Sequence, residues 1–158
     1  MRRRAEITLS SELDADPEAL WARITDPAGI NDELRPLMRM TVPRGVDGFG
    51  LDDLKPGRIG RSWILLFGFI PFDYDDLNIV RLDPGRGFLE RSSMLSMRLW
   101  EHERTLTPLE ESRCQITDRV AWEPRPPLPG HLFRPLVHAI FSHRHRRLRE
   151  RFPPLRFD

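Results

Sequence analysis

The fold of this chain is decided by residues 99–124, LWEHERTLTPLEESRCQITDRVAWEP. Two runs of alternating apolar and polar residues, Met97–Leu106 and Arg113–Trp122, flank the turn sequence PLEES at 108–112. Alternation with a period of two is typical of half-buried strands, and a short polar turn joins such strands as an antiparallel hairpin. The sequence therefore predicts that an antiparallel sheet precedes the C-terminal part of the chain.

The more apolar side of this hairpin is expected to face inward, because a strand buries its apolar face. With the turn centred near Glu110, the opposed inner pairs are predicted to be Trp100–Val120, His102–Asp118 and Arg104–Ile116. A preceding turn near Leu95 places Glu90 near Trp100 and Phe88 near His102. The hairpin therefore predicts a small group of charged side chains on an otherwise apolar inner face.

Upstream of the hairpin, short alternating runs are separated by turn sequences, as in an antiparallel meander. These runs predict the strands Ala5–Leu13, Arg58–Phe67, Asp73–Leu82 and Phe88–Met94, with a further strand and loop over Thr41–Gly57. Pro17 opens a short helix, since proline fits the first helical position. A second short helix is predicted from Pro27 through Leu37.

Downstream, residues 130–152 repeat apolar side chains at intervals of three and four, which predicts a long amphipathic helix. The apolar face contains Phe133, Leu136, Val137, Ile140, Phe141, Leu148 and Phe152. The far side is predicted to carry Arg144, Arg146, Arg147, Arg149 and Arg151. Cations are favoured near a helix C-terminus, so we interpret these arginines as a solvated face rather than a nucleic-acid patch.

The composition is that of a soluble globular protein: 39% of the residues are hydrophobic, 31% are charged and the formal net charge is +1. A length of 158 residues fits one domain over residues 1–158. The single Cys114 allows no internal disulfide, and the basic start Met1–Arg4 is followed by polar residues rather than by an apolar signal region. The longest apolar stretch, Trp63–Phe72, is too short to span a membrane as a helix, so we expect a cytoplasmic protein.

The order of elements resembles the START/polyketide-cyclase-like superfamily (SRPBCC), whose fold is called the helix grip. ITLSSELDADPEALWARITDP at 7–27 is similar to the first strand and helix of that superfamily, and LKPGRIGRSW at 54–63 to a strand-opening turn. LWEHERTLTPL and CQITDRVAWEP resemble its last two strands. The resemblance implies an α+β fold in which a curved antiparallel sheet of about seven strands wraps around the long C-terminal helix, with two short helices after the first strand.

The resemblance also implies an apolar cavity between sheet and helix that holds lipids, sterols, polyketides or hormones, and in a minority of members catalyses cyclisation or dehydration. The predicted ligand-binding residues are Trp63, Phe67, Phe88, Glu90, Trp100, His102, Arg104, Ile116, Asp118, Val120, Phe133, Val137 and Phe141. A histidine held by a carboxylate can anchor a polar group or act as an acid or base, so His102 and Asp118 are the candidate catalytic residues. The same charged residues could instead form a structural network that neutralises itself.

We expect a binding module for a small hydrophobic molecule rather than an enzyme; the alternatives are a cyclase/dehydratase-type enzyme and an interaction module with a filled cavity. No cofactor, metal or nucleic-acid partner is expected, because the chain has no phosphate-binding glycine loop and its C-terminal histidines lack metal-ligand spacing. The cavity entrance is predicted at Gly45–Gly50 and Phe67–Phe72. The phenylalanines of the second segment form a lid, a homodimer contact or part of the core.

Overall fold

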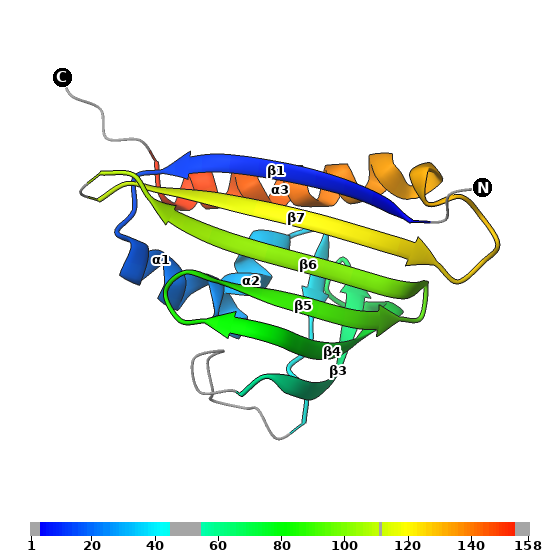
Figure 1. The fold of residues 1–158 in the computed structure, drawn as a ribbon. Coiled ribbons are helices and arrows are strands. Elements are labelled where there is room, and N and C mark those ends of the chain that lie inside the picture. Colours follow the sequence, from blue (N-terminus) through cyan, green and yellow to red (C-terminus); the bar gives the residue numbers. More distant parts are fainter. Residues whose placement is uncertain (1–3, 45–54, 111, 154–158) are drawn as a thin grey trace.

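The computed structural model describes residues 4–44, 55–110 and 112–153, which contain one seven-stranded antiparallel sheet (Figure 1). Its strands are β1 (Ala5–Leu13), β2 (Met38–Met40), β3 (Gly57–Leu66), β4 (Ile70–Asp83), β5 (Gly87–Met94), β6 (Met97–Pro108) and β7 (Cys114–Pro124). The helices are α1 (Pro17–Ile24), α2 (Pro27–Leu34) and α3 (Arg134–Arg151), the last preceded by a 3-10 turn, η2 (Gly130–Phe133). The predicted helix-grip architecture is confirmed.

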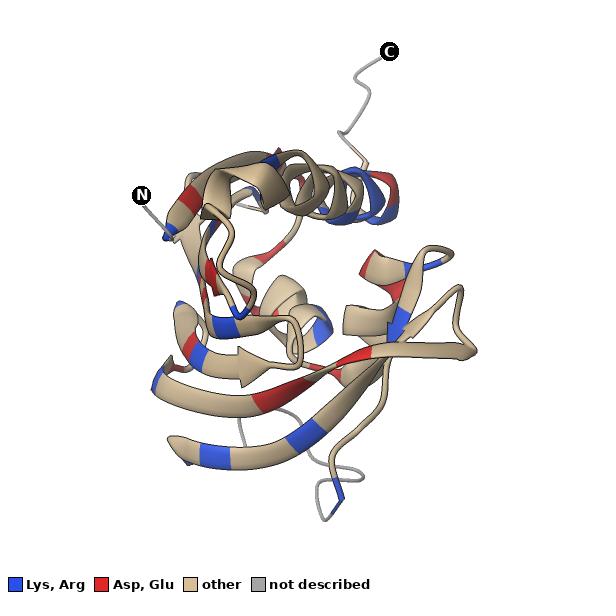
Figure 2. Ribbon diagram, turned by 90° about the vertical axis from the view of Figure 1, so that its right-hand side faces the viewer, with Lys and Arg blue, Asp and Glu red and all other residues tan. Residues whose placement is uncertain are grey.

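The sheet curls around one side of α3, with the strands in the order β1-β7-β6-β5-β4-β3-β2 (Figure 2). Register shifts interrupt the β3–β4 pairing after Arg58 and Ile64, and the β4–β5 pairing after Ile79. Such irregularities bend and twist strands, which supplies curvature to this half of the sheet. Among the described residues, no helix is long and apolar enough to cross a membrane.

The segment that joins α2 to the sheet differs from its prediction. The second helix ends at Leu34 rather than continuing through Leu37, because a residue before proline is disfavoured in the helical conformation and Pro36 follows Arg35. Strand β2 lies at Met38–Met40, ahead of the predicted start at Thr41. The predicted entrance loop Gly45–Gly50 lies outside the described residues.

The register of the β6–β7 hairpin is two residues away from the predicted one. His102 pairs with Val120, and Asp118 pairs with Arg104. The backbone N–H of Arg113 donates to the carbonyl of Glu110 at 3.1 Å, so the turn is centred one residue later than predicted. A shift of two residues keeps every side chain on its face, and His102 and Asp118 therefore share the inner face as diagonal neighbours.

The β5–β6 hairpin is shifted in the same way. Glu90 lies opposite His102 rather than opposite Trp100, and Phe88 lies opposite Arg104. Both errors arise from the centre of a turn, which alternation within the strands does not fix.

Helix α3 was predicted with its arginines on the solvent side, and that prediction is wrong for Arg144. This residue is 8% exposed, and its Nε donates to Oε1 of Glu33 on α2 at 3.1 Å. Arg147 also reaches α2, through hydrogen bonds to the Asp32 carbonyl and carboxylate at 3.0 Å. The basic residues toward the C-terminal end of α3 (Figure 2) therefore include two that fasten the helix to α2.

Two hydrophobic clusters fill the space between sheet and helices. One joins α1 to the C-terminal part of α3 and contains Leu20, Trp21, Ile116 and Leu148. The other lies toward the N-terminal part of α3 and contains Val120, Trp122, Val137 and Phe141. The indole N–H of Trp122 donates to the carbonyl of Gly130 at 2.9 Å, which ties the start of the helical segment to β7.

Candidate functional site

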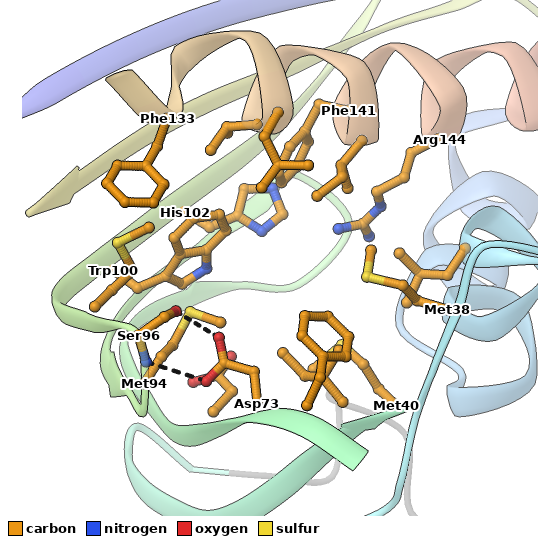
Figure 3. Close-up of a pocket in the computed structure, with 18 of the residues that line it drawn as sticks. Met38, Met40, Asp73, Met94, Ser96, Trp100, His102, Phe133, Phe141 and Arg144 are labelled. Atoms are coloured by element: carbon orange, nitrogen blue, oxygen red, sulfur yellow. Dashed lines mark hydrogen bonds between the residues drawn. The ribbon is translucent and has the colours of Figure 1, made fainter. Parts of the chain in front are cut away.

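A cavity of about 330 Å³ lies between the inner face of the sheet and α3 (Figure 3). Its wall consists of Leu34, Met38, Met40, Ile64, Phe72, Asp73, Asp75, Glu90, Met94, Ser96, Met97, Trp100, His102, Phe133, Leu136, Val137, Ile140, Phe141 and Arg144. Most of these side chains are apolar, and the polar ones come from the strands, from the β5–β6 turn and from α3.

The helix contributes to this wall because its cavity-facing residues recur every three or four positions. Val137, Ile140, Phe141 and Arg144 follow this spacing, and residues so spaced lie on one face of a helix. Figure 3 shows Phe141 and Arg144 pointing from the helix toward the cavity, with Trp100 and His102 facing them from the sheet. Alternation along β6 places Trp100 and His102 on the same side of the strand.

Four methionines form a large part of the remaining wall: Met38 and Met40 on β2, and Met94 and Met97 at the β5–β6 turn. Methionine side chains are unbranched and flexible, so they adapt to irregular apolar shapes. Leu136 lines the cavity while 59% exposed, which marks an open side of the site beside α3.

The structure brings six of the predicted ligand-binding residues to the cavity: Glu90, Trp100, His102, Phe133, Val137 and Phe141. The other seven lie elsewhere. Phe88 and Ile116 belong to the cluster beneath α1, and Val120 is buried in the second cluster. Arg104 and Asp118 are 0% and 1% exposed and lie beneath the wall.

The two remaining predicted residues point away from the cavity. Trp63 is 43% exposed and packs against Tyr74, and Phe67 is 59% exposed at the β3–β4 turn. Within the predicted entrance segment Phe67–Phe72, Phe72 alone lines the cavity. The alternation of β3 explains the error, since Ile64 rather than Trp63 faces inward.

Sequence reasoning missed Asp73 and Asp75, which it placed in the predicted strand Asp73–Leu82 but not among the ligand-binding residues. Both are buried and lie two residues apart on β4, so the alternation of this strand could have placed them on its inner face. In Figure 3, Asp73 meets Ser96: its carboxylate accepts hydrogen bonds from the Ser96 hydroxyl and, at 3.3 Å, from the Ser96 backbone N–H. This contact closes the β5–β6 turn against β4.

Behind the wall, Asp118 is the centre of a buried polar network. Its Oδ1 accepts from Nε of Arg104 and Nε2 of His102, both at 2.7 Å. Its Oδ2 accepts from Nη2 of Arg104 and Nε2 of His145, both at 2.8 Å. Since a carboxylate oxygen only accepts, these contacts place a proton on Nε2 of each histidine.

The network continues from Arg104 to α2. Arg104 donates through Nη1 and Nη2 to Glu33 at 3.0 and 2.8 Å, and Arg144 donates to the same carboxylate. Two arginines thus balance the two acids Glu33 and Asp118, as a self-neutralising network requires.

The charges in this network hold one another ionised. Burial alone would raise the pKa of Asp118, but Arg104 and then His102 outweigh it and hold that pKa well below its ordinary value. Burial likewise opposes ionisation of Glu33, and the coulombic attraction of Arg104 and Arg144 keeps its pKa lowered. Burial would lower the pKa of Arg104, yet Asp118 and Glu33 raise it above its ordinary value.

His102 and Arg144 are the members of this network that line the cavity. The ring of His102 packs edge-on against Phe88 and Phe141, with centroids 5.4 and 5.1 Å away. Nε2 is occupied by Asp118, and no hydrogen bond to Nδ1 is found within the described ranges. The imidazole is therefore oriented by Asp118, with a second nitrogen left for another partner.

Residues suited to metal binding do not gather in the part of the chain that the structure describes, where no group of three or more His, Cys, Asp or Glu side chains could hold an ion. Cys114 is buried, and burial raises the pKa of its thiol. A thiol in that state is a poor nucleophile, so Cys114 lies outside the candidate chemistry.

Comparison with known proteins finds a family that matches the sequence and solved structures that match the fold. The family described as "Domain of unknown function (DUF8410)" matches residues 11–152. No curated protein matches the sequence.

Among solved structures, a START superfamily protein from Mycobacterium smegmatis is 12% identical, with a TM-score of 0.70 over 93% of this chain and 96% of that one. A protein from Chromobacterium violaceum is 17% identical, with a TM-score of 0.71 over 95% and 98% of the two chains. The Zhui aromatase/cyclase from Streptomyces sp. R1128 is 13% identical, with a TM-score of 0.62 over 91% and 88%. These likenesses confirm the predicted helix-grip fold.

Proposed function

This chain belongs to the family described as a domain of unknown function (DUF8410), and we propose that it binds a small hydrophobic molecule in the cavity between the sheet and α3. The observation that carries the proposal is the cavity itself, about 330 Å³ in volume with a mainly apolar wall. Sites for small molecules are concave, largely apolar and about 300 Å³ or more in volume. Side chains do not fill this space, which argues against an interaction module with a packed interior.

The buried network supports binding rather than chemistry as the main role. The hydrogen-bonding groups of Asp118 and Arg104 are already paired with one another and with Glu33, His102 and His145. They fix the shape of the wall without reaching the cavity. A START superfamily protein and an aromatase/cyclase share this fold.

Binding can be tested with a neutral apolar fluorophore, N-phenylnaphthylamine, whose emission rises in apolar surroundings. Leu136 lines the cavity, whereas the similarly exposed Leu132 does not. Leu136→Arg should weaken binding because it places a charge at the open side of the cavity. Leu132→Arg is the matched control and should bind as the wild type does. Equal affinities for both variants and the wild type would contradict the proposed location, and native mass spectrometry would identify any co-purifying ligand.

A cyclase/dehydratase-type activity is the second candidate, favoured by one observation. His102 is oriented by Asp118 and keeps Nδ1 without a partner among the described residues, as an acid or base in a cavity would require. Turnover of a model polyketone, and its loss in His102→Phe, would establish this activity. Binding of the polyketone without turnover by the wild type would refute it.

A further inference from the structure

Three acidic side chains enter the cavity wall from β4 and β5: Asp73, Asp75 and Glu90. Asp73 is provided with donors, since it accepts hydrogen bonds from Ser96 and, at 2.8 Å, from the Tyr74 backbone N–H. Asp75 and Glu90 differ from Asp73 in one oxygen each. Oδ1 of Asp75 and Oε2 of Glu90 are buried without a hydrogen-bond partner in the described part of the chain, although the two residues are only 3% and 6% exposed.

The contrast with Asp118 shows how unusual this pair is within the same molecule. Both oxygens of Asp118 are saturated by donors from Arg104 and two histidines. Within the described ranges, no ion pair reaches Asp75 or Glu90. Arg144, the cation in the cavity wall, is held by Glu33.

Asp75 and Glu90 also lie within hydrogen-bonding reach of one another. Burial and the neighbouring Glu90 carboxylate raise the pKa of Asp75 well above its ordinary range. Two adjacent carboxyls in an apolar site cannot both ionise at little cost unless a donor or a positive charge reaches them. The Ser92 hydroxyl, which accepts from the Asn78 N–H at 3.0 Å, is a further partner of Asp75.

A buried acceptor without a donor is rare and costs about 1–3 kcal/mol, so two of them beside one cavity call for a partner that is not part of this chain. That partner must bring at least two hydrogen-bond donors, because two oxygens are left open. It should also bring a positive charge, because an ionised carboxyl in an apolar wall is costly without one. A primary ammonium group meets both requirements.

We propose that Asp75 and Glu90 form the polar subsite of the cavity and select an apolar molecule that carries a basic amine. The ammonium donates to Oδ1 of Asp75 and Oε2 of Glu90, and the alkyl or aromatic part lies against the apolar wall formed by Trp100, Phe141 and the methionines. This inference rests on the proposed function, since it requires the cavity to be the ligand site. It adds the class of ligand and the residues that select it.

The test compares decylamine, decanol and decanoate, which share one chain and differ in the head group, by calorimetric titration at neutral pH. An alkylamine is protonated there, as a lysine side chain is. Decylamine should bind at least about tenfold more tightly than decanol, equivalent to about 1.4 kcal/mol, and decanoate should bind most weakly. Decyltrimethylammonium carries the same charge without an N–H donor, and it should lose most of the advantage of decylamine.

Variants then locate the preference. Asp75→Asn and Glu90→Gln should each lower the ratio of the decylamine affinity to the decanol affinity, measured on the same variant. Asp76→Asn is the matched control, because Asp76 is the next residue of β4 but pairs with Arg61 on the other side of the strand. That variant should keep the advantage.

The outcomes separate the two proposals. Binding of decanol without any preference for decylamine overturns the amine subsite and leaves the hydrophobic site standing. A preference that survives in both Asp75→Asn and Glu90→Gln also overturns the subsite. Failure of all the probes to bind counts against the proposed function itself. The comparison of the four probes on the wild-type protein needs no variant to fold.

Discussion

Replacing Arg104 with methionine tests whether the buried network stabilises the fold as its geometry indicates. Arg104 is 0% exposed and makes four charge-assisted hydrogen bonds, two to Asp118 and two to Glu33. Methionine keeps much of the aliphatic volume but leaves two buried carboxylates without their shared cation. Removing one partner of a buried ion pair costs about 3–5 kcal/mol, a large part of the 5–15 kcal/mol that stabilises a typical domain.

Arg119 provides the matched control on the outer face of the same hairpin. It also contacts several carboxylates (Glu6, Glu101 and Glu103), but its side chain is 27% exposed. Water and salt screen such pairs, so Arg119→Met should cost less than about 1 kcal/mol. The two substitutions are chemically identical and differ in burial.

Urea denaturation followed by tryptophan fluorescence measures both changes, since the chain has four tryptophans. The free energy of unfolding should fall by about 3–5 kcal/mol in Arg104→Met and by less than about 1 kcal/mol in Arg119→Met. Adding Glu33→Gln and Asp118→Asn to Arg104→Met should recover part of the loss, because the unpaired charges are then gone. Equal losses for the two single variants would refute the assignment of the network as a stabilising element.

Three further outcomes follow from the same physical arguments. The pKa of Asp118 is lowered by its partners, so its ionised carboxylate stabilises the fold above the pKa of about 4 that it has in the unfolded chain, and this stability is lost as the pH falls. The free energy of unfolding, measured from about pH 5 to about pH 2, should therefore decline less in Asp118→Asn than in the wild type. The pKa of Asp75 is raised, so its ionisation destabilises the fold as the pH rises above about 4, the opposite of the effect of Asp118. Asp75→Asn should therefore melt at a higher temperature than the wild type at pH 8, and the difference should shrink toward pH 4. A Cβ at Gly87 would lie 2.4 Å from the backbone carbonyl oxygen of Arg104, so Gly87→Ala should destabilise the protein by about 1–3 kcal/mol in urea denaturation; a change near zero would show that the β5–β6 pair can separate freely.

The sequence predicted the layers of this fold well because alternation and helical spacing report burial directly. Ala5–Leu13 and its neighbours carry a period of two, and the period predicts each strand without knowledge of its partner. The hairpin registers are different. They depend on which residue occupies the centre of a turn, and PLEES at 108–112 permits more than one centre.

The prediction of the candidate site was incomplete for a related reason. The inner face of β6 and β7 is longer than the cavity, so inward-facing residues such as Ile116 divide between the cavity wall and the core under α1. No one-dimensional pattern marks that division. Arg144 was assigned to solvent because its partner, Glu33, lies on a helix that is distant in the sequence.

The pairing of the first strand with the last has a consequence for the order in which the sheet can assemble during synthesis. Strands β2 to β7 each pair with their neighbour in the sequence, whereas Ala5 of β1 pairs with Trp122 of β7. Strand β1 leaves the ribosome first and cannot be paired until nearly the whole meander has been made. Contacts between residues so far apart in the chain form slowly, because closing a long loop costs entropy before any contact is gained. The closing of β1 onto β7, under the last-made helix, should therefore be the late step that completes the walls of the cavity.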